Sequence, residues 1–310
     1  MTTTPPPSPK IAVEPRSGRH ESLIAAVTAA GGVVSPVEEA DALVWADAAR
    51  ADLLRGVLAA GPQVRWVQLP FAGIESYVHL LDDEHEWTCG KGVYAPPVAE
   101  HALAMTLAGL RHLVGYGRVQ AWTAPVGRNL IGAQVTILGG GEITRELISL
   151  LAPFGAHVTV VRRQTGPVDG ADVTLTTDRL HQALPGADVV VLALALTPET
   201  VGIIGSAELA LMEPHAWLVN VARGRHVDTH ALVDVLRAHE IGGAALDVTD
   251  PEPLPPEHPL WRLPNCLITP HTANTPEMGI PLLAERVRDN VRRFALGETL
   301  LGRVDVVGGY

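Results

Sequence analysis

The sequence has few of the residues that stabilise small secreted domains or bind metals. Only two cysteines, Cys89 and Cys266, occur in 310 residues, so the sequence predicts neither a disulfide framework nor a metal site built on paired cysteines. We expect both cysteines to be inert packing residues. Their scarcity is typical of a reducing compartment, and we expect a cytoplasmic protein with no bound metal.

Positive charge is also scarce in this chain. The 23 basic residues are outnumbered by 34 acidic ones, and the net charge of −11 argues against nucleic acid or an anionic membrane as the main partner. No apolar run reaches the roughly 20 residues needed to span a bilayer. The segment from Met1 to Lys10 is rich in Thr and Pro and lacks the apolar region of a signal peptide, so we expect a disordered tail there.

Alternating strand-like and helix-like segments predict an α/β fold with parallel sheets. A chain of 310 residues has the length of two domains of ordinary size. In the first domain we expect strands at 11–13, 42–46 and 64–69 and helices at 21–30 and 48–60. Pro96-Pro97 is expected to break the chain before a helix at 98–113 that leads into the second domain. Beyond it we expect strands at 134–138, 157–161, 188–193, 216–219, 243–246 and 266–268 and helices at 207–211, 229–239 and 278–294.

A glycine-rich turn follows the first strand of the second domain. Its sequence is Gly139-Gly140-Gly141-Glu142-Ile143-Thr144, and a position between a strand and a helix is the setting of a dinucleotide-binding fingerprint. Gly139 and Gly141 fit that pattern. Thr144 stands where the third glycine allows close helix packing, so we expect an outward shift of the helix or a compensating contact. A Glu142 carboxylate is unfavourable beside a pyrophosphate. The alternative is a structural turn that no longer binds phosphate.

The residues after the next strand bear on the choice of cofactor. The strand ends in Arg162-Arg163, at the position where NAD-specific sites carry an acidic residue for the ribose 2′-hydroxyl. Arginine at this point suits a 2′-phosphate, so we expect NADP(H) to be favoured over NAD(H). The alternative is a solvated pair of surface arginines.

Three later segments carry side chains suited to a 2-keto acid. Arg223, Glu252 and His271 each follow an apolar strand-like run, and residues past the carboxyl ends of parallel strands line the ligand crevice. Arginine can hold a carboxylate through two parallel hydrogen bonds, and histidine exchanges a proton near neutral pH. A carboxylate beside the histidine favours its charged form and fixes its tautomer. Each residue alone is more often structural, but together they predict one converging site for a small anionic substrate.

These motifs together resemble the D-isomer-specific 2-hydroxyacid dehydrogenase family, which includes glyoxylate/hydroxypyruvate reductases and phosphoglycerate dehydrogenases. Besides the Arg, Glu and His segments, the resemblance is carried by Gly92-Val93-Tyr94-Ala95-Pro96-Pro97-Val98-Ala99-Glu100-His101, by Leu196-Thr197-Pro198-Glu199-Thr200 and by the ending Asn290 to Tyr310. It extends over nearly the whole chain. It implies hydride transfer between NAD(P)H and a small 2-keto acid or D-2-hydroxy acid. Arg223 would bind and polarise the substrate, His271 would be the acid/base, and Glu252 its partner.

The same resemblance implies an architecture and further binding residues. It predicts a Rossmann-type doubly wound domain at 97–276 and a smaller, discontinuous flavodoxin-like domain at 1–96 and 277–310. The backbone of Ala72 and Gly73 is expected to bind the substrate carboxylate, and Asp247 to lie close to the carboxamide of the cofactor. A homodimer is implied, with 98–113 and 116–122 at the interface. The full set of expected cofactor-binding residues is Gly139, Gly141, Glu142, Ile143, Arg162, Arg163, Ala222 and Asp247.

Two alternatives lie outside the active-enzyme hypothesis. One is a cofactor-sensing interaction protein like the C-terminal-binding-protein corepressors, against which the intact Arg-Glu-His set and the absence of long tails argue. The other is a catalytically silent relative with weakened dinucleotide binding, suggested by Thr144 and Glu142. Asn274 is a further departure, because a glycine often follows Pro-His-x-Ala in the family. Phe71 and Tyr94 indicate a substrate pocket with bulky walls.

Overall fold

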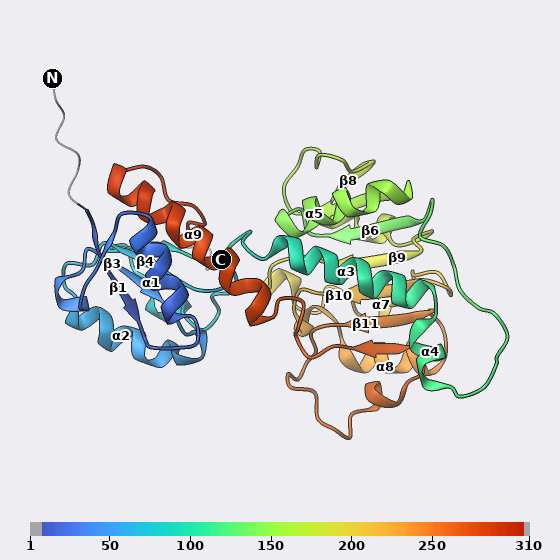
Figure 1. Cartoon of the computed structure of the whole chain (residues 1–310). Coiled ribbons are helices and arrows are strands. Elements are labelled where there is room, and N and C mark those ends of the chain that lie inside the picture. The colour runs from blue at the N-terminus through green and yellow to red at the C-terminus, as the bar shows by residue number, and fades with distance from the viewer. Residues whose placement is uncertain (1–7, 307–310) are drawn as a thin grey trace. The chain divides into compact units, whose positions relative to one another are not determined.

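The computed structural model describes residues 8–306 of the chain. The chain divides into two compact units (Figure 1): unit 1 combines Met1–Tyr94 with Thr275–Tyr310, and unit 2 comprises Ala95–Asn274. The first seven residues of the expected N-terminal tail lie outside the described residues. The expectation that this tail extends to Lys10 is wrong, because Lys10 begins the first strand of unit 1.

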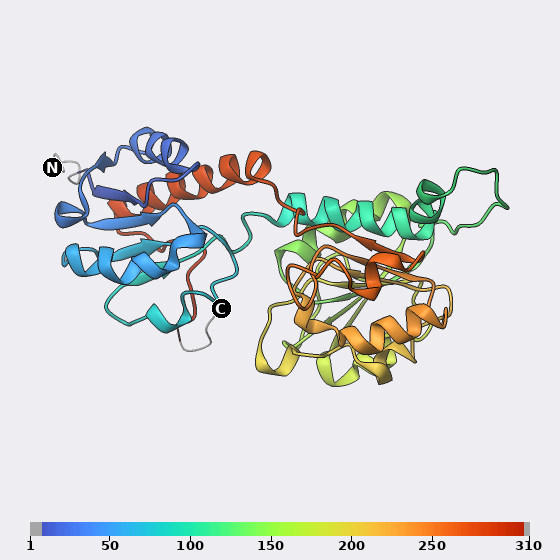
Figure 2. The same ribbon diagram turned by 90° about the horizontal axis from the view of Figure 1, so that it is seen from below.

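Unit 1 is built around a five-stranded parallel sheet. Its strands are β1 (Lys10–Glu14), β2 (Val33–Val34), β3 (Ala42–Trp45), β4 (Trp66–Gln68) and β5 (Glu86–Thr88). Their order, β2-β1-β3-β4-β5, is that of flavodoxin-like folds. The helices are α1 (His20–Ala29), α2 (Ala51–Ala60) and α9 (Pro276–Leu296), with 3-10 helices η1 (Val37–Glu39), η2 (Ala48–Arg50) and η3 (Val78–Leu80). Helices α1 and α9 lie side by side (Figures 1 and 2), so a C-terminal segment completes this unit.

Unit 2 contains a seven-stranded parallel sheet. Its strands are β6 (Gln134–Leu138), β7 (His157–Arg162), β8 (Val173–Thr176), β9 (Val189–Leu192), β10 (Trp217–Asn220), β11 (Gly243–Leu246) and β12 (Cys266–Ile268). Their order, β8-β7-β6-β9-β10-β11-β12, is the doubly wound order of dinucleotide-binding folds with one strand added. The predicted fold class, a Rossmann-type domain with a smaller discontinuous flavodoxin-like one, is confirmed.

The helices of unit 2 cover both faces of this sheet because its central strands are apolar on both sides. Within β9, Val189 and Val191 join a core cluster that includes residues of α3 and α5, while Val190 and Leu192 join one that includes residues of α8. Alternate side chains of a strand point to opposite faces, so the continuous apolar run is that of a doubly covered parallel strand. The helices are α3 (Ala95–Leu110), α4 (Leu113–Arg118), α5 (Glu142–Leu151), α6 (Leu180–Ala183), α7 (Ser206–Leu209) and α8 (Thr229–Arg237). Short 3-10 helices are η4 (Ala152–Phe154), η5 (Thr177–Arg179), η6 (Pro198–Thr200), η7 (Gly224–His226) and η8 (Pro259–Arg262).

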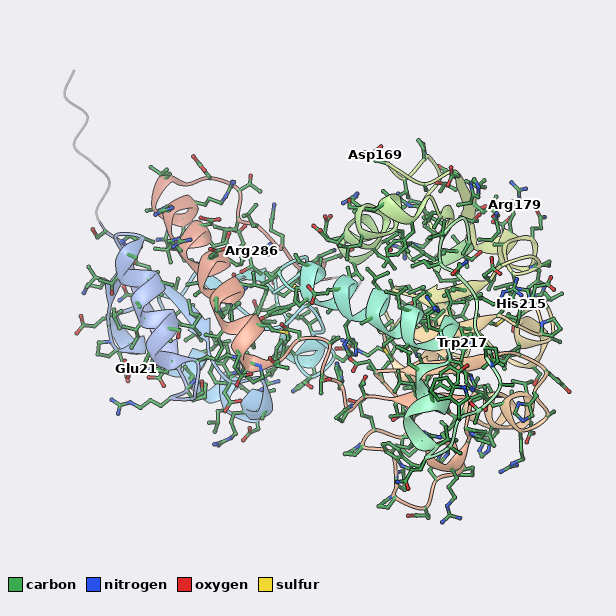
Figure 3. The ribbon with its side chains drawn as sticks, turned by 45° about the vertical axis from the view of Figure 1, so that its right-hand side comes forward. Glu21, Asp169, Arg179, His215, Trp217 and Arg286 are labelled. Atoms are coloured by element: carbon green, nitrogen blue, oxygen red, sulfur yellow. The ribbon has the colours of Figure 1, made fainter. Side chains whose placement is uncertain are left out.

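Helix α3 begins three residues before the predicted start. It includes Pro96 and Pro97 in its first turn, where the missing N–H of proline costs nothing because that N–H has no partner inside the helix. The expected break before Val98 is therefore wrong. Further along α3, Gly109 lies against the ring of Trp217, and a Cβ at this position would come within 2.5 Å of that ring. Trp217 is labelled in Figure 3. Close packing of α3 on β10 thus depends on this glycine.

Both cysteines lie in the interior of the protein. Cys89 and Cys266 are free and buried, and burial raises the pKa of the Cys266 thiol to about 12; both properties are those of packing residues. Residues 8–306 contain no cluster of three His, Cys, Asp or Glu side chains suited to a metal ion. In the same residues, every helix is too short or too polar to cross a membrane.

Candidate functional site

Parallel pairing aligns the ends of five strands in unit 2. Leu138, Leu192, Asn220, Leu246 and Ile268 form one row across β6, β9, β10, β11 and β12. The loops that leave this row carry the glycine-rich turn and the predicted Arg, Glu and His residues. Between β6 and β9 the strand order reverses, which is where ligands bind in open α/β sheets.

The glycine-rich turn has the shape of a dinucleotide cradle. Gly139 has a φ of +112°, and a Cβ there would lie 2.2 Å from the carbonyl oxygen of Ala193 after β9, so only glycine fits. Gly141 is the N-cap of α5 without a side-chain cap, and the space around its Cα is open. The first N–H groups of a helix have no partner inside it, and together with the helix dipole they suit a phosphate group. The turn therefore fits the pyrophosphate of a dinucleotide.

The two departures from the fingerprint are compensated. Thr144 is fully buried, and its hydroxyl donates a 2.9 Å hydrogen bond to the carbonyl oxygen of Gly139, so the larger side chain ties the helix to the turn. The sequence predicts either an outward shift of the helix or a compensating contact at Thr144, and this hydrogen bond is such a contact. The Glu142 carboxylate forms an ion pair with Arg145 one turn along α5, which offsets its negative charge. Ile143 is half-buried and packs against the core.

Arg162 lies directly over the glycine-rich turn. The nearest atom to a Cβ built at Gly140 is Arg162 Cδ, at 3.0 Å, and the Arg162 guanidinium donates to the side chain of Gln164. Arg163 lies within electrostatic range of Glu199 in the loop after β9. The pKa of Glu199 is lowered, first by a hydrogen bond with Thr197 and in smaller part by the charge of Arg163. Both arginines thus lie near the switch point of the sheet.

The Arg223 loop is held by a network of backbone contacts. Asn220 bridges it, accepting from the N–H of Ala222 at 3.0 Å and donating to the carbonyl oxygen of Arg223 at 2.9 Å. Arg223 Nη1 donates to the carbonyl oxygen of Ala222 at 2.8 Å, which orients the guanidinium. The predicted substrate-binding and cofactor-binding residues of this loop are therefore adjacent and restrained.

His226 is a buried residue of this loop that the sequence does not single out. Its Nδ1 accepts from the N–H of Arg223 at 3.2 Å, and its Nε2 faces the carbonyl oxygen of Ala195 at 3.3 Å. Burial lowers the pKa of His226, so the neutral ring carries its proton on Nε2 and donates it to Ala195. His226 thereby links the loops after β9 and β10. In the sequence, only the position of His226 just after Ala222-Arg223-Gly224 could have indicated this role.

The Arg223 loop and the Glu252 loop are in contact because Gly224 has no side chain. A Cβ at Gly224 would lie 2.0 Å from the backbone carbon and oxygen of Thr249. Thr249 in turn donates from its hydroxyl to the carbonyl oxygen of Pro251 at 2.8 Å. The segment that carries Glu252 is therefore packed directly on the segment that carries Arg223.

Glu252 and His271 form a short contact between the β11 and β12 loops. His271 Nδ1 lies 2.6 Å from Glu252 Oε1, and both side chains are partly exposed, at 51% and 40%. With a carboxylate as the acceptor, the Nδ1 proton is the donor, and Nε2 is left as the atom that can exchange a proton. His271 has a φ of +52°, a left-handed conformation that few residues other than glycine adopt.

Asp247 holds the loop that carries His271. Its Oδ1 accepts from Thr269 Oγ1 at 2.6 Å and from Thr272 N–H at 2.9 Å, and its Oδ2 accepts from Ala273 N–H at 3.1 Å. The carbonyl oxygen of Asp247 accepts from His271 N–H at 2.8 Å. A residue expected to contact the cofactor is thus also the anchor of the loop, and its cofactor contact stays a prediction.

His101 on α3 extends this network. Its Nε2 lies 3.0 Å from Thr269 Oγ1 and 3.4 Å from Asp247 Oδ1. His101 thus makes a polar link between α3 and the His271 loop. Asn274 Oδ1 is buried without a hydrogen-bond partner in the described part of the chain. Asn274 is the residue that stands where the family often has a glycine.

Ala72 and Gly73 belong to unit 1, in the loop after β4. Gly90 N–H donates to the carbonyl oxygen of Phe71 at 3.0 Å and fixes the start of this turn. The N–H groups of Ala72 and Gly73 have no acceptor within residues 8–306. This arrangement suits an incoming anion, and their role in binding the substrate stays a prediction.

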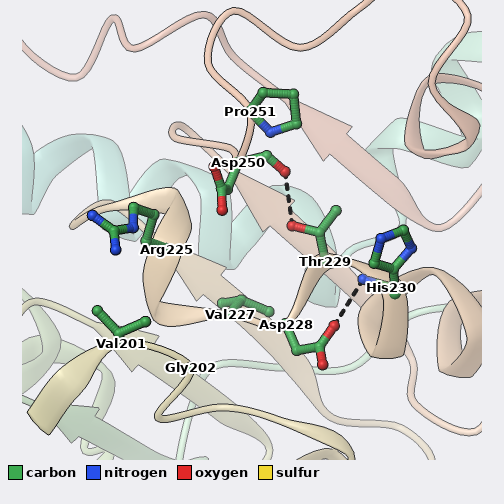
Figure 4. Close-up of a pocket in the computed structure, with 9 residues that line it drawn as sticks. All are labelled: Val201, Gly202, Arg225, Val227, Asp228, Thr229, His230, Asp250 and Pro251. Carbon is green, nitrogen blue, oxygen red and sulfur yellow. Dashed lines mark hydrogen bonds between the residues drawn. The ribbon is translucent and has the colours of Figure 1, made fainter. Parts of the chain in front are cut away.

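A surface hollow of about 380 Å³ in unit 2 lies apart from the predicted residues. Figure 4 shows its lining of Val201, Gly202, Arg225, Val227, Asp228, Thr229, His230, Asp250 and Pro251. Asp228 caps helix α8 by accepting from His230 N–H at 2.9 Å, and the Thr229 hydroxyl donates to the carbonyl oxygen of Asp250 at 2.9 Å. These contacts stabilise the backbone. Because Arg223, Glu252 and His271 are not among its lining residues, the hollow is not the candidate site.

The Asp247 network yields a pH-dependent stability. Burial acts to raise the pKa of Asp247, but hydrogen bonds from His101, Thr269 and the N–H groups of Thr272 and Ala273 outweigh it and lower the pKa. A carboxyl whose pKa is lowered on folding stabilises the protein above its unfolded pKa, about 4, and loses that contribution as the pH falls through its folded pKa.

We therefore expect Asp247→Asn to lower the unfolding free energy by about 2 kcal/mol at pH 7, since hydrogen bonds to a charged group contribute roughly 1.5–3 kcal/mol. Chemical denaturation of the wild type and the variant should show this difference shrinking below about pH 4. Asp250→Asn, at an exposed residue, is the control and should change little. An equal loss in both variants, or a difference that does not vary with pH, would contradict the assignment.

Comparison with known proteins agrees with this geometry. The family model for the NAD binding domain of D-isomer specific 2-hydroxyacid dehydrogenases matches residues 102–273. The chain is 40% identical over 255 residues to an uncharacterized protein in the proB 3'region of Corynebacterium melassecola, covering 80% of this chain and 84% of that protein. It is 31% identical over 220 residues to glyoxylate/hydroxypyruvate reductase A of Serratia proteamaculans (strain 568), covering 70% and 69% of the two chains.

A solved structure gives the same result over the full fold. The D-isomer specific 2-hydroxyacid dehydrogenase from Xanthobacter autotrophicus Py2, in complex with NADPH and MES, matches with a TM-score of 0.84 and 28% identity, covering 98% of this chain and 100% of that one. The family model, the curated relatives and the fold agree with one another. The chain belongs to the D-isomer specific 2-hydroxyacid dehydrogenase family.

Proposed function

We propose that this protein reduces a small 2-keto acid to the D-2-hydroxy acid, with NADPH as the preferred cofactor. The observation that carries the proposal is the 2.6 Å contact between His271 Nδ1 and Glu252 Oε1. It lies on loops that follow adjacent strands, and the Glu252 loop is packed on the Arg223 loop through Gly224. An imidazole held by a carboxylate can transfer a proton, and a guanidinium can bind the carboxylate of a keto acid.

In this proposal Arg223 binds the substrate and His271 protonates it. The planar guanidinium carries five N–H donors, so it can hold the carboxylate and also stabilise charge that grows on the carbonyl oxygen. Bound NADPH supplies the hydride. His271 gives the Nε2 proton to the carbonyl oxygen, and Glu252 keeps the other ring proton on Nδ1 and fixes the ring orientation.

The glycine-rich turn and the arginines after β7 would hold the cofactor. Gly139 and Gly141 leave room for the pyrophosphate at the start of α5. Arg162, which lies over the turn, would pair with the 2′-phosphate. The relative from Xanthobacter autotrophicus is described in complex with NADPH, which supports the same preference.

Two other functions make different experimental predictions. A cofactor-sensing interaction protein binds NADPH but turns over no keto acid. A catalytically silent relative with weakened dinucleotide binding does neither. The hydrogen bond of Thr144 and the ion pair of Glu142 weigh against the second, because both keep the turn intact. Titration of NADPH fluorescence together with the assay below separates the three.

Arg223→Lys tests the substrate site. NADPH oxidation over glyoxylate, hydroxypyruvate, pyruvate, phenylpyruvate and a branched keto acid should identify a turned-over substrate for the wild type. Removing the guanidinium in Arg223→Ala should lower kcat by about 10²–10³-fold, as for loss of one oxyanion donor. Lysine should restore only part of this, because an ammonium cannot make the planar two-point contact. Full activity of Arg223→Lys, or no wild-type turnover over the panel, counts against the proposal.

The cofactor preference has its own test. We expect a higher kcat/KM and a lower dissociation constant for NADPH than for NADH, and Arg162→Asp should reverse or abolish the preference because it replaces the cation by an anion at the 2′-phosphate. Arg179→Asp, an exposed arginine whose side chain bonds Gln182, makes the same charge change as a control. Equal kcat/KM for the two cofactors in the wild type defeats this part of the proposal.

We also propose a homodimer whose interface includes residues 98–113 and 116–122. The segment after α4 extends away from the rest of unit 2 (Figures 1 and 2). It exposes apolar side chains: Val119 is 46%, Trp122 103% and Val126 53% exposed. Exposed aromatic side chains of this kind are typical of interface anchors.

Light scattering at micromolar concentration tests the dimer. The wild type should give twice the 32.8 kDa mass of the monomer, and Trp122→Ser should shift the mass towards the monomer. Trp261→Ser is the matched control. Trp261 is also exposed, at 41%, but its indole N–H donates to the carbonyl oxygen of Pro255. A monomeric mass for the wild type contradicts the proposal.

A further inference from the structure

Arg19, which has no role in the proposed reaction, lies at the carboxyl edge of the unit 1 sheet. Arg19 follows β1, and its guanidinium contacts the loops after two other strands. Arg19 Nη1 lies 3.4 Å from the carbonyl oxygen of Ala46 after β3. Its Cζ lies 4.9 Å from the centroid of the Phe71 ring after β4. Ligands of open parallel sheets bind at this edge.

Arg19 is restrained but has no ionic partner. Its backbone N–H donates to Ser17 Oγ at 3.2 Å, and its side chain is held by the Phe71 face and the Ala46 carbonyl oxygen. Within residues 8–306 it forms no ion pair. Asp47, which directly follows Ala46, accepts from Ala49 N–H at 3.0 Å. A half-buried cation that forms no ion pair is suited to a bound anion.

Two guanidinium groups lie near the Phe71 turn, although the chain as a whole is acidic. Tyr94 donates from its hydroxyl to the carbonyl oxygen of Pro70 in this turn. Burial raises the pKa of Tyr94, and the charges of Arg19 and Arg286 act in the opposite direction, so both guanidinium groups lie within electrostatic range. Arg286, on α9 (Figure 3), donates to the carbonyl oxygens of Lys91 and Cys89, at 3.1 and 3.4 Å.

The two arginines differ in what they can offer a ligand. Arg286 is committed to backbone oxygens and desolvated, and burial lowers its pKa. The Arg19 guanidinium contacts one backbone oxygen and the face of the Phe71 ring. Most of its five N–H donors are therefore available to another group. The Ala72 and Gly73 N–H groups, next in sequence to Phe71, also have no acceptor among residues 8–306. The Phe71 turn and the Arg19 guanidinium stacked on its ring thus each carry N–H groups suited to an anion.

We propose that Arg19 is a specificity-determining residue that binds a second anionic group of the substrate, a carboxylate or phosphate ester at the far end from the reacting keto group. This inference rests on the proposed reductase function. The Ala72-Gly73 turn binds the carboxylate next to the keto group, and Arg19, stacked on Phe71 of the same turn, binds the distal anion. The preferred substrate is therefore a doubly charged 2-keto acid.

Substrate pairs that differ in the distal charge test this directly. The pairs are oxaloacetate with 2-ketobutyrate, 2-ketoglutarate with 2-ketovalerate, and 3-phosphohydroxypyruvate with hydroxypyruvate. We expect the charged member of at least one pair to have the higher kcat/KM. Preference confined to the third pair identifies a phosphate, and preference in the first two identifies a carboxylate.

Variants at Arg19 assign the preference to this residue. Arg19→Met should lower kcat/KM for the charged member by about 10- to 100-fold, the effect of losing a charge-assisted hydrogen bond, and should leave the uncharged member nearly unchanged. Arg19→Lys should keep part of the preference. Arg16→Met removes the same charge from an exposed residue of the same loop and should have no selective effect.

Binding measured without turnover separates this inference from the proposed reaction. Calorimetric titration of the NADP⁺ complex with D-malate and with D-2-hydroxybutyrate should show tighter binding of D-malate, lost in Arg19→Met. If D-malate keeps this advantage while no keto acid is reduced, the reductase proposal fails and the anion site stands. If Arg19→Met weakens both members of a pair equally, or changes neither, the assignment of Arg19 is overturned.

Discussion

Parallel pairing in unit 2 sets the position of every predicted catalytic side chain. The register places the ends of β9, β10, β11 and β12 in one row, and the loop after β10 is packed directly on the backbone of the loop after β11. Gly224 is the point where this matters most, because a Cβ there would collide with Thr249. Residues far apart in sequence become neighbours since the strands end together, and the proposed chemistry follows from that alignment.

A second constraint is the backbone conformation of His271. A left-handed φ of +52° at a non-glycine residue persists only where the surroundings hold it. Asp247 supplies that hold through its carboxylate and its carbonyl oxygen, and Glu252 fixes the ring through Nδ1. Stability and function are therefore linked in this loop: the buried carboxylate that stabilises the fold also determines where the proposed proton donor lies.

The sequence predicts most of the continuously apolar strands well and the exposed or partly polar ones poorly. The expected bounds of β6, β11 and β12 match the observed ones, because each is a buried run that ends at a turn. The strands β2, β5 and β8 are missed; β2 has only two residues, and β8 is a polar strand at the sheet edge. At the site, the pairing of Glu252 with His271 follows from family resemblance, whereas the links made by His226 and His101 depend on tertiary contacts that no local pattern encodes.

The most direct test of the account is the turnover of His271→Ala with NADPH and the keto acid that the wild type reduces fastest, measured beside NADPH binding by fluorescence. General acid–base catalysis contributes about 10²–10⁴-fold, so we predict a loss of kcat in that range with unchanged cofactor affinity. Near-normal turnover in a variant that still binds NADPH would contradict the assignment of His271 as proton donor and remove the main support for the proposed reaction.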